Sequence, residues 1–143
     1  MSEIIEGHCL CGNIHYRLAN KPLRSHLCFC TDCQKATGGD RNHVATIAIE
    51  DFELLAGNLN IYEATAASGR ITERAFCSDC GCNIYGAVKE LGGMGVNVPC
   101  LNNPQEYPPQ AAVFVSQAAS WSAMPEGIPQ YPEMPSYEND FAE

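Results

Sequence analysis

The sequence predicts a mainly β fold made of small sheets that metal–cysteine crosslinks hold together. Short stretches that are rich in β-branched residues or alternate in hydrophobicity recur along the 143 residues, whereas no long amphipathic helix is present. Eight of the nine cysteines fall into three short clusters, a distribution typical of metal ligands rather than of scattered core residues. Because small sheets bury little apolar surface, we expect bound metal to supply part of the stability.

The expected strands are short and follow one another closely along the chain. They are expected at residues 13–18, 24–28, 43–49, 51–57, 59–62, 70–76, 83–86, 95–98 and 111–115. A chain of this length fits one domain. We expect that zinc-binding domain to span residues 1–143, with its core at 7–131 and a loose acidic tail at 136–143.

One short helix is expected directly after the central cysteine cluster. Thr31 or Asp32 has the side chain to cap a single helical turn there. Gly38 and Gly39 follow and would end that turn, because glycine adopts the backbone conformation in which many helices stop. The cluster is therefore predicted to lie at a junction between a strand and a helical turn.

The outer two clusters contain cysteine pairs whose spacing suits one zinc ion. Cys9 and Cys11 are separated by one residue, and Cys77 and Cys80 by two, so both thiols of each pair can reach one ion from a tight turn. Zinc in structural sites takes four such ligands in a tetrahedron, with sulfur at about 2.3 Å. The two pairs are therefore predicted to form a closed structural zinc site at the base of the long segment between them.

The central cluster brings Cys28, Cys30 and Cys33 within six residues. Three thiolates leave one corner of a zinc tetrahedron open, and an open corner is typical of a catalytic zinc that binds water or substrate. A substrate thiol suits that corner because zinc favours the thiolate form, which is the nucleophile. Cys82 leaves two alternatives: it closes this second site as its fourth ligand, or it is a spare thiol outside the site.

The composition limits the class of partner and the compartment. The formal charge is −9, from eight basic and seventeen acidic side chains, which argues against a nucleic-acid partner. No run approaches the roughly 18 apolar residues that a membrane helix needs, and the first residues lack the pattern of a secretory signal. We therefore expect a cytoplasmic protein, and in a reducing compartment close-set cysteines are metal ligands rather than disulfides.

In its cysteine motifs the chain resembles a known family, the glutathione-dependent formaldehyde-activating enzymes and the related centromere protein V group. The resemblance covers roughly residues 7–131, with the motifs in the family's order and spacing. The matching motifs are Cys9-Leu-Cys11-Gly12, then Cys28-Phe-Cys30-Thr-Asp-Cys33 with Gly38, then Phe76-Cys77-Ser-Asp-Cys80-Gly81, and finally Trp121 with Gly127-Ile-Pro-Gln-Tyr131.

The resemblance implies a fold and a chemistry. The fold would be a β-tent of small antiparallel sheets, with a structural zinc on the outer cysteine pairs and a catalytic zinc on the central three. The activity would be that of a carbon–sulfur lyase, in which the glutathione thiolate attacks formaldehyde to give S-hydroxymethylglutathione. Glutathione would be the co-substrate, and Arg24, Lys35 and Arg41, which flank the central cluster, are candidates to bind its carboxylates.

Three departures from the family pattern leave the substrate open. Cys82 and Gln34 stand where the family commonly has a small hydroxyl residue and an arginine, and residues 39–43 are unusually polar. The alternative function is a non-catalytic, zinc-stabilised binding or scaffold module on the same fold, as the centromere protein V branch suggests. His26 and His43 are candidates to support the central cluster. A homo-oligomer that pairs edge strands is compatible with the sequence, which does not require one.

Overall fold

The protein is built mostly of short strands. The computed structural model describes residues 4–66 and 68–135. The strands are β1 (Ile5–His8), β2 (His15–Leu18), β3 (Arg24–Cys28), β4 (Asn42–Ala48), β5 (Phe52–Ala56), β6 (Leu59–Thr65), β7 (Ile71–Cys77), β8 (Asn83–Val88), β9 (Gly93–Asn97) and β10 (Ala112–Val113). The α-helix of the described residues is α1 (Thr31–Thr37), and the 3-10 turns are η1 (Ile49–Asp51), η2 (Lys89–Leu91), η3 (Val98–Cys100), η4 (Pro104–Glu106) and η5 (Val115–Gln117).

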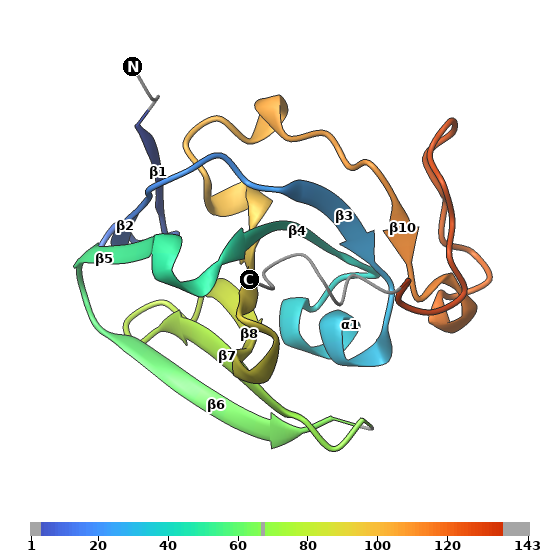
Figure 1. Cartoon of the computed structure of the whole chain (residues 1–143), viewed down its shortest axis with the longest axis horizontal. Coiled ribbons are helices and arrows are strands. Elements are labelled where there is room, and N and C mark those ends of the chain that lie inside the picture. Colours follow the sequence, from blue (N-terminus) through green and yellow to red (C-terminus); the bar gives the residue numbers. More distant parts are fainter. Residues whose placement is uncertain (1–3, 67, 136–143) are drawn as a thin grey trace.

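These strands form two sheets (Figure 1). The smaller sheet has the order β1-β2-β5, and the larger has the order β10-β3-β4-β9-β8-β7-β6. Neighbouring strands pair antiparallel, except that β10 runs parallel to β3. The predicted mainly β class is confirmed. Local periodicity does not say how many strands join one sheet, and the larger sheet joins seven.

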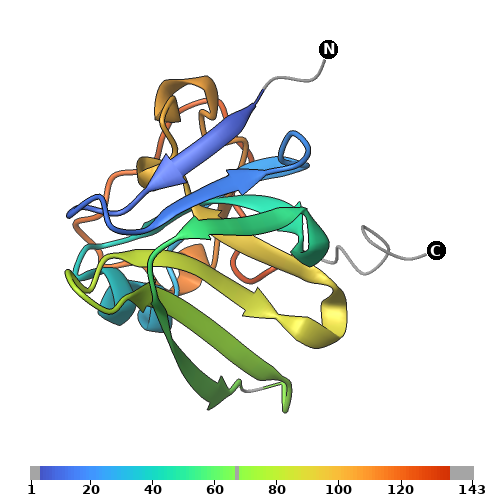
Figure 2. The ribbon, with the colours of Figure 1, turned by 90° about the vertical axis from the view of Figure 1, so that its left-hand side faces the viewer.

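Figure 2 shows the two sheets from the side. The main hydrophobic core contains buried residues from both of them. The smaller sheet and the turns beside it contribute the buried residues Ile5, Cys9, Ile14, Tyr16 and Leu18. The larger sheet contributes Ala45, Ile47, Cys77, Ile84, Ala87, Met94 and Val96. Two cysteines, Cys9 and Cys77, are thus part of this core, and their side chains are 2% and 1% exposed.

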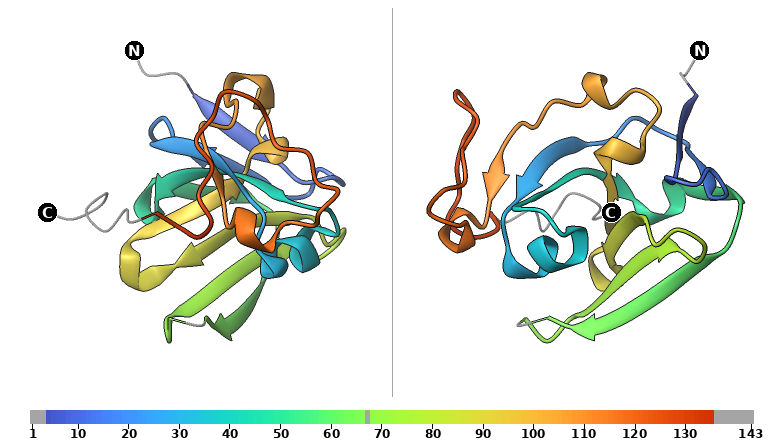
Figure 3. Two further views of the ribbon diagram at one scale, coloured as in Figure 1. Left: turned by 90° about the vertical axis from the view of Figure 1, so that its right-hand side faces the viewer. Right: turned by 180° about the vertical axis from the view of Figure 1, so that it is seen from behind.

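The other face of the larger sheet carries a different set of side chains. Successive residues of a strand point to opposite faces, so β4 directs Ala45 and Ile47 to the core and Val44 and Thr46 away from it. The C-terminal segment folds along the side formed by β3 and α1 (Figure 3). A second, small core holds this segment in place: Leu27, Phe29 and Ala112, with Val115, Ala118, Met124 and Ile128 packed against them.

The helix begins one residue earlier than predicted. Cys30, not Thr31 or Asp32, is the N-cap, and its sulfur accepts a hydrogen bond from the backbone N–H of Cys33 at 3.3 Å. A cysteine takes this position because the sulfur can replace the oxygen acceptor of an ordinary cap. The predicted end is confirmed, because Gly38 caps the helix in the left-handed conformation with φ 75°.

Several strand boundaries differ from the sequence-based prediction. Strand β6 continues to Thr65, beyond its predicted end at residue 62, because β7 pairs with it along its whole length. Strand β1 forms at residues for which no strand was predicted, since it finds its partner in β2. The acidic tail predicted at 136–143 lies outside the described residues. Within the described ranges, no helix is long and apolar enough to cross a membrane.

Candidate metal centres and the adjoining cavity

Four cysteines far apart in the sequence meet at one point of the fold. The sulfur atoms of Cys9, Cys11, Cys77 and Cys80 all lie within 4.8 Å of one another. The Cys9 and Cys11 sulfurs are 3.5 Å apart, and those of Cys11 and Cys77 are 3.8 Å apart. We call this group the four-thiol centre. Its members are the two pairs that the spacing assigned to one site.

Tight turns aim these four sulfurs inward. Gly12, with φ 83°, closes the first turn through its N–H to the carbonyl of Cys9 at 3.2 Å. Gly81, with φ 76°, does the same for Cys77 at 2.9 Å. Both positions need a backbone conformation that favours glycine. Each motif therefore contains a glycine because the turn that directs the thiols inward favours this residue.

Backbone N–H groups surround the sulfurs and favour their thiolate form. The N–H groups of Asp79 and Cys80 both donate to the Cys77 sulfur at 3.4 Å, and that of Ile14 donates to the Cys9 sulfur at 3.2 Å. Backbone hydrogen bonds at Cys82 and Cys11 lower the pKa of the Cys80 thiol to about 6. Thiolate is the form that binds metal, so this environment is suited to a cation.

The four-thiol centre fits a zinc ion. Tetrahedral zinc with bonds of about 2.3 Å separates its sulfur ligands by about 3.8 Å, close to the distances found here. Four thiolates complete such a tetrahedron and leave no position for a substrate. The chemistry of these donors therefore matches a closed, structural metal site.

The second group consists of Cys28, Cys30 and Cys33, which we call the three-thiol centre. Their sulfurs lie within 4.8 Å of one another, and the Cys28 thiol donates to the Cys30 sulfur at 3.3 Å. The three come from the end of β3, the N-cap of α1 and the first turn of that helix. The strand–helix junction thus converges three side chains that are close in sequence, as the spacing predicted.

Negative charge in the three-thiol centre gathers on Cys30. Hydrogen bonds from Cys28 and then from Cys33 hold the pKa of the Cys30 thiol far below its usual range. The same contact with Cys30 raises the pKa of the Cys28 thiol. Cys30 thus resembles a thiolate that two neighbouring thiols stabilise. Such a thiolate is a suitable ligand for a soft metal cation. Three donors leave one corner of a tetrahedral ion free.

A cavity of about 550 Å³ adjoins the three-thiol centre on the face of the larger sheet that is turned away from the main core. Cys28 and Cys33 form part of its wall. The strand register places the other lining residues on the same face: residue pairs directly opposite each other are Arg24 with Thr46, His26 with Val44, Cys28 with Asn42, Val44 with Asn97, and Arg74 with Gly86. An ion held at this centre would therefore border the cavity.

Glycine residues form part of the cavity wall and leave space where larger side chains would stand. Gly86, Gly93 and Gly95 lie on adjacent strands, with Gly86 opposite Gly95 in the register, and all three line the cavity. A Cβ atom placed on Gly86 would come no nearer than 3.9 Å to another residue, whereas one on Gly95 would lie 3.2 Å from the Cβ of Val44. Glycine at these positions thus leaves room that larger residues would fill.

The cavity is basic although the chain is acidic. Three of the eight lysines and arginines line it, namely Arg24, Arg70 and Arg74. One guanidinium nitrogen of Arg74 lies 4.0 Å from the Cys33 sulfur, so this side chain reaches the three-thiol centre. Glu73 also lines the cavity, but Lys89 neutralises its carboxylate through an ion pair at 2.9 Å. Arg70 in turn forms an ion pair with Glu90 at 3.9 Å. The described lining has three basic side chains against one acidic one, a balance that favours an anionic ligand.

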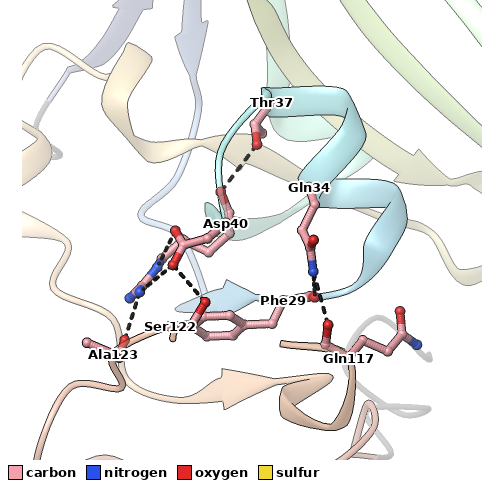
Figure 4. A network of polar contacts seen from close by, with 8 residues as sticks. Phe29, Gln34, Thr37, Asp40, Gln117, Ser122 and Ala123 are labelled. Carbon is pink, nitrogen blue, oxygen red and sulfur yellow. Dashed lines mark hydrogen bonds and ion pairs between the residues drawn. The ribbon is translucent and has the colours of Figure 1, made fainter. Parts of the chain in front are cut away.

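The structure separates the three cations that the sequence placed beside the central cluster. Arg24 lines the cavity, whereas Lys35 is exposed on α1 and is not among the lining residues. Arg41 turns to the C-terminal segment: it forms an ion pair with Asp40 at 2.9 Å and donates to the carbonyl of Ala123 at 2.7 Å (Figure 4). Its guanidinium also stacks over the Phe29 ring at 4.7 Å.

Gln34, which stands where the family commonly has arginine, also contacts the C-terminal segment (Figure 4). Its side-chain amide donates to the carbonyl of Phe29 at 2.8 Å and to that of Gln117 at 3.1 Å. Gln34 therefore ties α1 to the C-terminal segment. The polarity of residues 39–43 has a similar explanation, because Asp40 accepts from Ser122 at 3.0 Å in the same network.

Arg70 and Arg74 are cavity residues that the sequence analysis did not identify. Arg74 lies on β7 and Arg70 directly precedes that strand, more than 35 positions after the central cysteines. Only the pairing of β7, β8, β9 and β4 brings both arginines to the same cavity. The alternation of the predicted strand at 70–76 was a usable signal, because it places Arg70, Thr72 and Arg74 on one face.

The two histidines differ in their relation to the cavity. His26 lines it and is 7% exposed, and burial, followed by the nearby charge of Arg24, lowers the pKa of its imidazole to about 4. At neutral pH the cavity is thus bordered by a neutral ring. His43, one residue further along β4 from Asn42, points to the opposite side of the strand from the cavity residues Asn42 and Val44.

The Cys82 thiol belongs to neither thiol centre, although its backbone adjoins the four-thiol centre. Its sulfur is 3.5 Å from that of Cys100, and the three-thiol group of the described residues does not include it. Cys82 follows directly after the turn of the four-thiol centre, and its carbonyl accepts from the N–H of Cys77 at 3.0 Å. The structure therefore pairs it with Cys100, which is the arrangement of a thiol outside the second site.

Comparisons with known proteins concern the fold and the family. A crystal structure of a Rhodobacter sphaeroides protein superposes with a TM-score of 0.56 at 20% sequence identity, covering 87% of this chain and 98% of that one. At this identity the likeness concerns the fold. A family model described as glutathione-dependent formaldehyde-activating enzyme matches residues 4–117, which contain both thiol centres and most of the lining of the cavity. The chain therefore belongs to the glutathione-dependent formaldehyde-activating enzyme family.

Proposed function

We propose that this protein is a zinc-dependent enzyme that forms a carbon–sulfur bond between glutathione and a small electrophile of the formaldehyde type. Membership of the family supports a function related to glutathione and formaldehyde, and the two thiol groups fit zinc. The observation that carries the proposal is the contact between the three-thiol centre and a basic cavity. A purely structural metal site would need no such opening.

The cavity suits glutathione in charge and in size. Glutathione is an extended tripeptide with two carboxylates, one amino group and one thiol, and its net charge at neutral pH is negative. Arg24, Arg70 and Arg74 lie in the wall, and the planar guanidinium is well suited to carboxylates. Arg74 also lies beside the Cys33 sulfur. A carboxylate bound to Arg74 would therefore be close to the three-thiol centre.

The residues of the chain would orient the two reactants. The arginines would fix the peptide part of glutathione, so that its thiol is directed to Cys28 and Cys33. A zinc ion held by the three cysteines would supply a Lewis acid that favours the thiolate form of the substrate. The sulfur would bond to the carbonyl carbon, and the proton lost by the thiol would end on the carbonyl oxygen. The addition needs neither oxidant nor reductant.

The amides of Asn42 and Asn97 lie beside the three-thiol centre on adjacent strands, and both line the cavity. Asn42 donates weakly to Asn97 at 3.5 Å, and Asn97 donates to the carbonyl of Asn83 at 3.0 Å. This row of polar groups is positioned to donate to the oxygen that becomes an alkoxide during the addition.

The test measures zinc, binding and turnover on the same preparations. Zinc is counted by elemental mass spectrometry on full-length protein purified without added metal, and glutathione binding is measured by calorimetry. The rate of adduct formation is followed by exchange spectroscopy with ¹³C-labelled formaldehyde. The proposal expects two zinc ions per chain, glutathione binding, and exchange faster than in buffer. The matched control is Cys33→Ser, which should keep one ion and lose the acceleration.

Two results would contradict the proposal. Tight zinc at both centres, with no effect of glutathione on either ion and no acceleration, would favour the alternative of a non-catalytic module. Acceleration that persists in Cys33→Ser would mean that the chemistry does not use the three-thiol centre. Other small thiols in place of glutathione, tested in the same assay, would show how much the arginines contribute to the choice of substrate.

A further inference from the structure

Cys82 and Cys100 form a close thiol pair that neither metal centre uses. Their sulfurs are 3.5 Å apart, although the two residues are 18 positions apart in the sequence. Neither belongs to a group of described side chains that could hold a metal ion. Both side chains are partly exposed, and both pack against the main core beside Cys80. This pair does not depend on the function proposed above.

The backbone holds the two thiols in place from both sides. Cys82 directly precedes β8 and is fixed by its hydrogen bond to Cys77. Cys100 ends η3, directly after β9, and β9 is the strand that pairs with β8. A disulfide requires sulfur atoms about 2.05 Å apart. The two sulfurs therefore need to approach by only about 1.5 Å.

Both thiols also contact one carbonyl. The thiols of Cys82 and Cys100 donate to the backbone oxygen of Asn83, at 3.6 Å and 3.4 Å. The same oxygen accepts from the side chain of Asn97 at 3.0 Å. The side-chain amide of Asn83 donates to the carbonyl of Ala36, in the helix that carries Cys33. Asn83 therefore connects the thiol pair to the wall of the cavity.

We propose that Cys82 and Cys100 are a redox-active dithiol, separate from both metal centres, that reacts with a low-molecular-weight disulfide such as glutathione disulfide. One thiolate attacks a sulfur of glutathione disulfide, forms a mixed disulfide and releases one glutathione as thiolate. The second cysteine loses its proton and attacks the protein sulfur of the mixed disulfide. The Cys82–Cys100 bond forms and a second glutathione leaves. The dithiol loses two electrons and two protons, and the glutathione disulfide is reduced to two glutathione molecules.

Oxidation has a defined structural consequence. A disulfide has no S–H group, so the carbonyl of Asn83 loses the two thiol donors and keeps the amide of Asn97. Asn83 also anchors α1 through Ala36. We therefore expect the anchor to loosen when the dithiol is oxidised, and the backbone of α1 to open more often.

The experiment uses zinc-loaded, full-length protein, because bound zinc protects its thiolate ligands from oxidation. The protein is treated with glutathione disulfide, alkylated to block free thiols, and analysed by intact mass and by peptide mapping. The expected result is a loss of two hydrogen masses, a peptide crosslink between Cys82 and Cys100, and an unchanged zinc count. The single variants Cys82→Ser and Cys100→Ser should each lose the crosslink and keep the zinc.

Several outcomes would overturn the proposal. They are a crosslink between other cysteines with release of zinc, a stable mixed disulfide with glutathione in the native chain, or no change of mass at glutathione disulfide concentrations that oxidise a reference dithiol. The expected loosening of α1 is tested separately, by measuring hydrogen exchange of the α1 amides in the reduced and oxidised forms. Faster exchange after oxidation is expected, and equal exchange would overturn this step.

Discussion

The four-thiol and three-thiol centres use the same ligand type but lie in different surroundings. Cys9 and Cys77 of the first belong to the core between the two sheets. Cys28 and Cys33 of the second border a cavity on the opposite face of the larger sheet. The first centre joins residues more than 60 positions apart, whereas the second lies within one strand–helix junction. The larger sheet thus separates a centre that joins distant parts of the chain from one that borders a cavity.

We expect the surroundings, together with the number of thiols, to distinguish the proposed structural metal site from the proposed reactive one. Cysteines supply both centres, but only the second lies beside a wall with three arginines and a floor of glycines. Variants that affect one centre and spare the other test this division. The largest expected effect is on the centre that crosslinks the chain.

Replacement of Cys77 by alanine should unfold much of the protein. Structural zinc sites bind with about 10–16 kcal/mol of apparent free energy, which is as large as the total stability of most domains, about 5–15 kcal/mol. Circular dichroism and zinc content measured together should show loss of structure and of metal. Cys100→Ser, which removes a cysteine outside both centres, is the control. A native-like Cys77→Ala with both ions would mean that the four-thiol centre does not stabilise the fold.

Replacement of Cys33 by serine should leave a folded protein with one zinc fewer. The helix N-cap hydrogen bond uses the backbone N–H of Cys33 and the sulfur of Cys30, so it survives this change. We expect the unfolding temperature to fall far less than in Cys77→Ala, while the glutathione-dependent rate falls by more than about 100-fold. If the two variants unfold alike, the division between the two centres is wrong.

Replacement of Arg74 by glutamine should weaken glutathione binding by about tenfold, because a hydrogen bond to a charged group contributes about 1.5–3 kcal/mol. Calorimetry at low and at moderate salt measures the loss and its screening. Arg41→Gln is the matched control, since Arg41 faces Asp40 and the C-terminal segment instead of the cavity. Equal losses in the two variants would show that the effect comes from net charge and not from the cavity.

Replacement of Gly86 by valine should weaken ligand binding with little effect on stability. A Cβ atom there has no neighbour nearer than 3.9 Å, and valine is favoured in strands, so the free energy of unfolding should stay within about 1 kcal/mol. Glutathione affinity should fall severalfold. Gly95→Val is the contrast, because its Cβ would crowd Val44 and cost about 1–3 kcal/mol. Unchanged affinity in Gly86→Val would move the ligand away from the cavity floor.

The smallest effect concerns His43, whose imidazole has its pKa lowered by burial, against a weaker, opposite effect of a backbone hydrogen bond at Tyr107. Below its ordinary pKa of about 6.5 the unfolded chain takes up this proton before the folded one does. Stability should therefore decrease as the pH falls from about 7.5 to about 5.5. Unfolding of His43→Gln should show a shallower pH dependence over this range. Parallel curves would remove His43 as a contributor.

The sequence was most informative where the chemistry is local. The spacings Cys9–Cys11, Cys77–Cys80 and Cys28–Cys33 identified both thiol centres, because a tight turn or a helix start fixes where neighbouring side chains point. The strand at residues 24–28 was predicted with its observed bounds for the same reason, and the end of α1 followed from Gly38. The cap at Cys30 was missed because cysteine is rarely considered as an acceptor.

The sequence was least informative about the cavity. Arg24, Lys35 and Arg41 were chosen by their distance along the chain, and only Arg24 lies in the wall. Arg70 and Arg74 lie there because β7 pairs with β8 and β8 with β9. Strand order and register depend on which partners bury the most apolar surface, and no local pattern specifies them.

By itself the sequence determined the mainly β class, the family and the two sets of thiols. Each of them follows from short motifs whose own residues are near one another in the chain. What only the tertiary structure decided is which thiols meet the cavity, which cations face it, and that Cys82 pairs with Cys100. The physical reason is that sheet register converts residues distant in sequence into neighbours, and a shift of one residue would turn every cavity side chain to the other face.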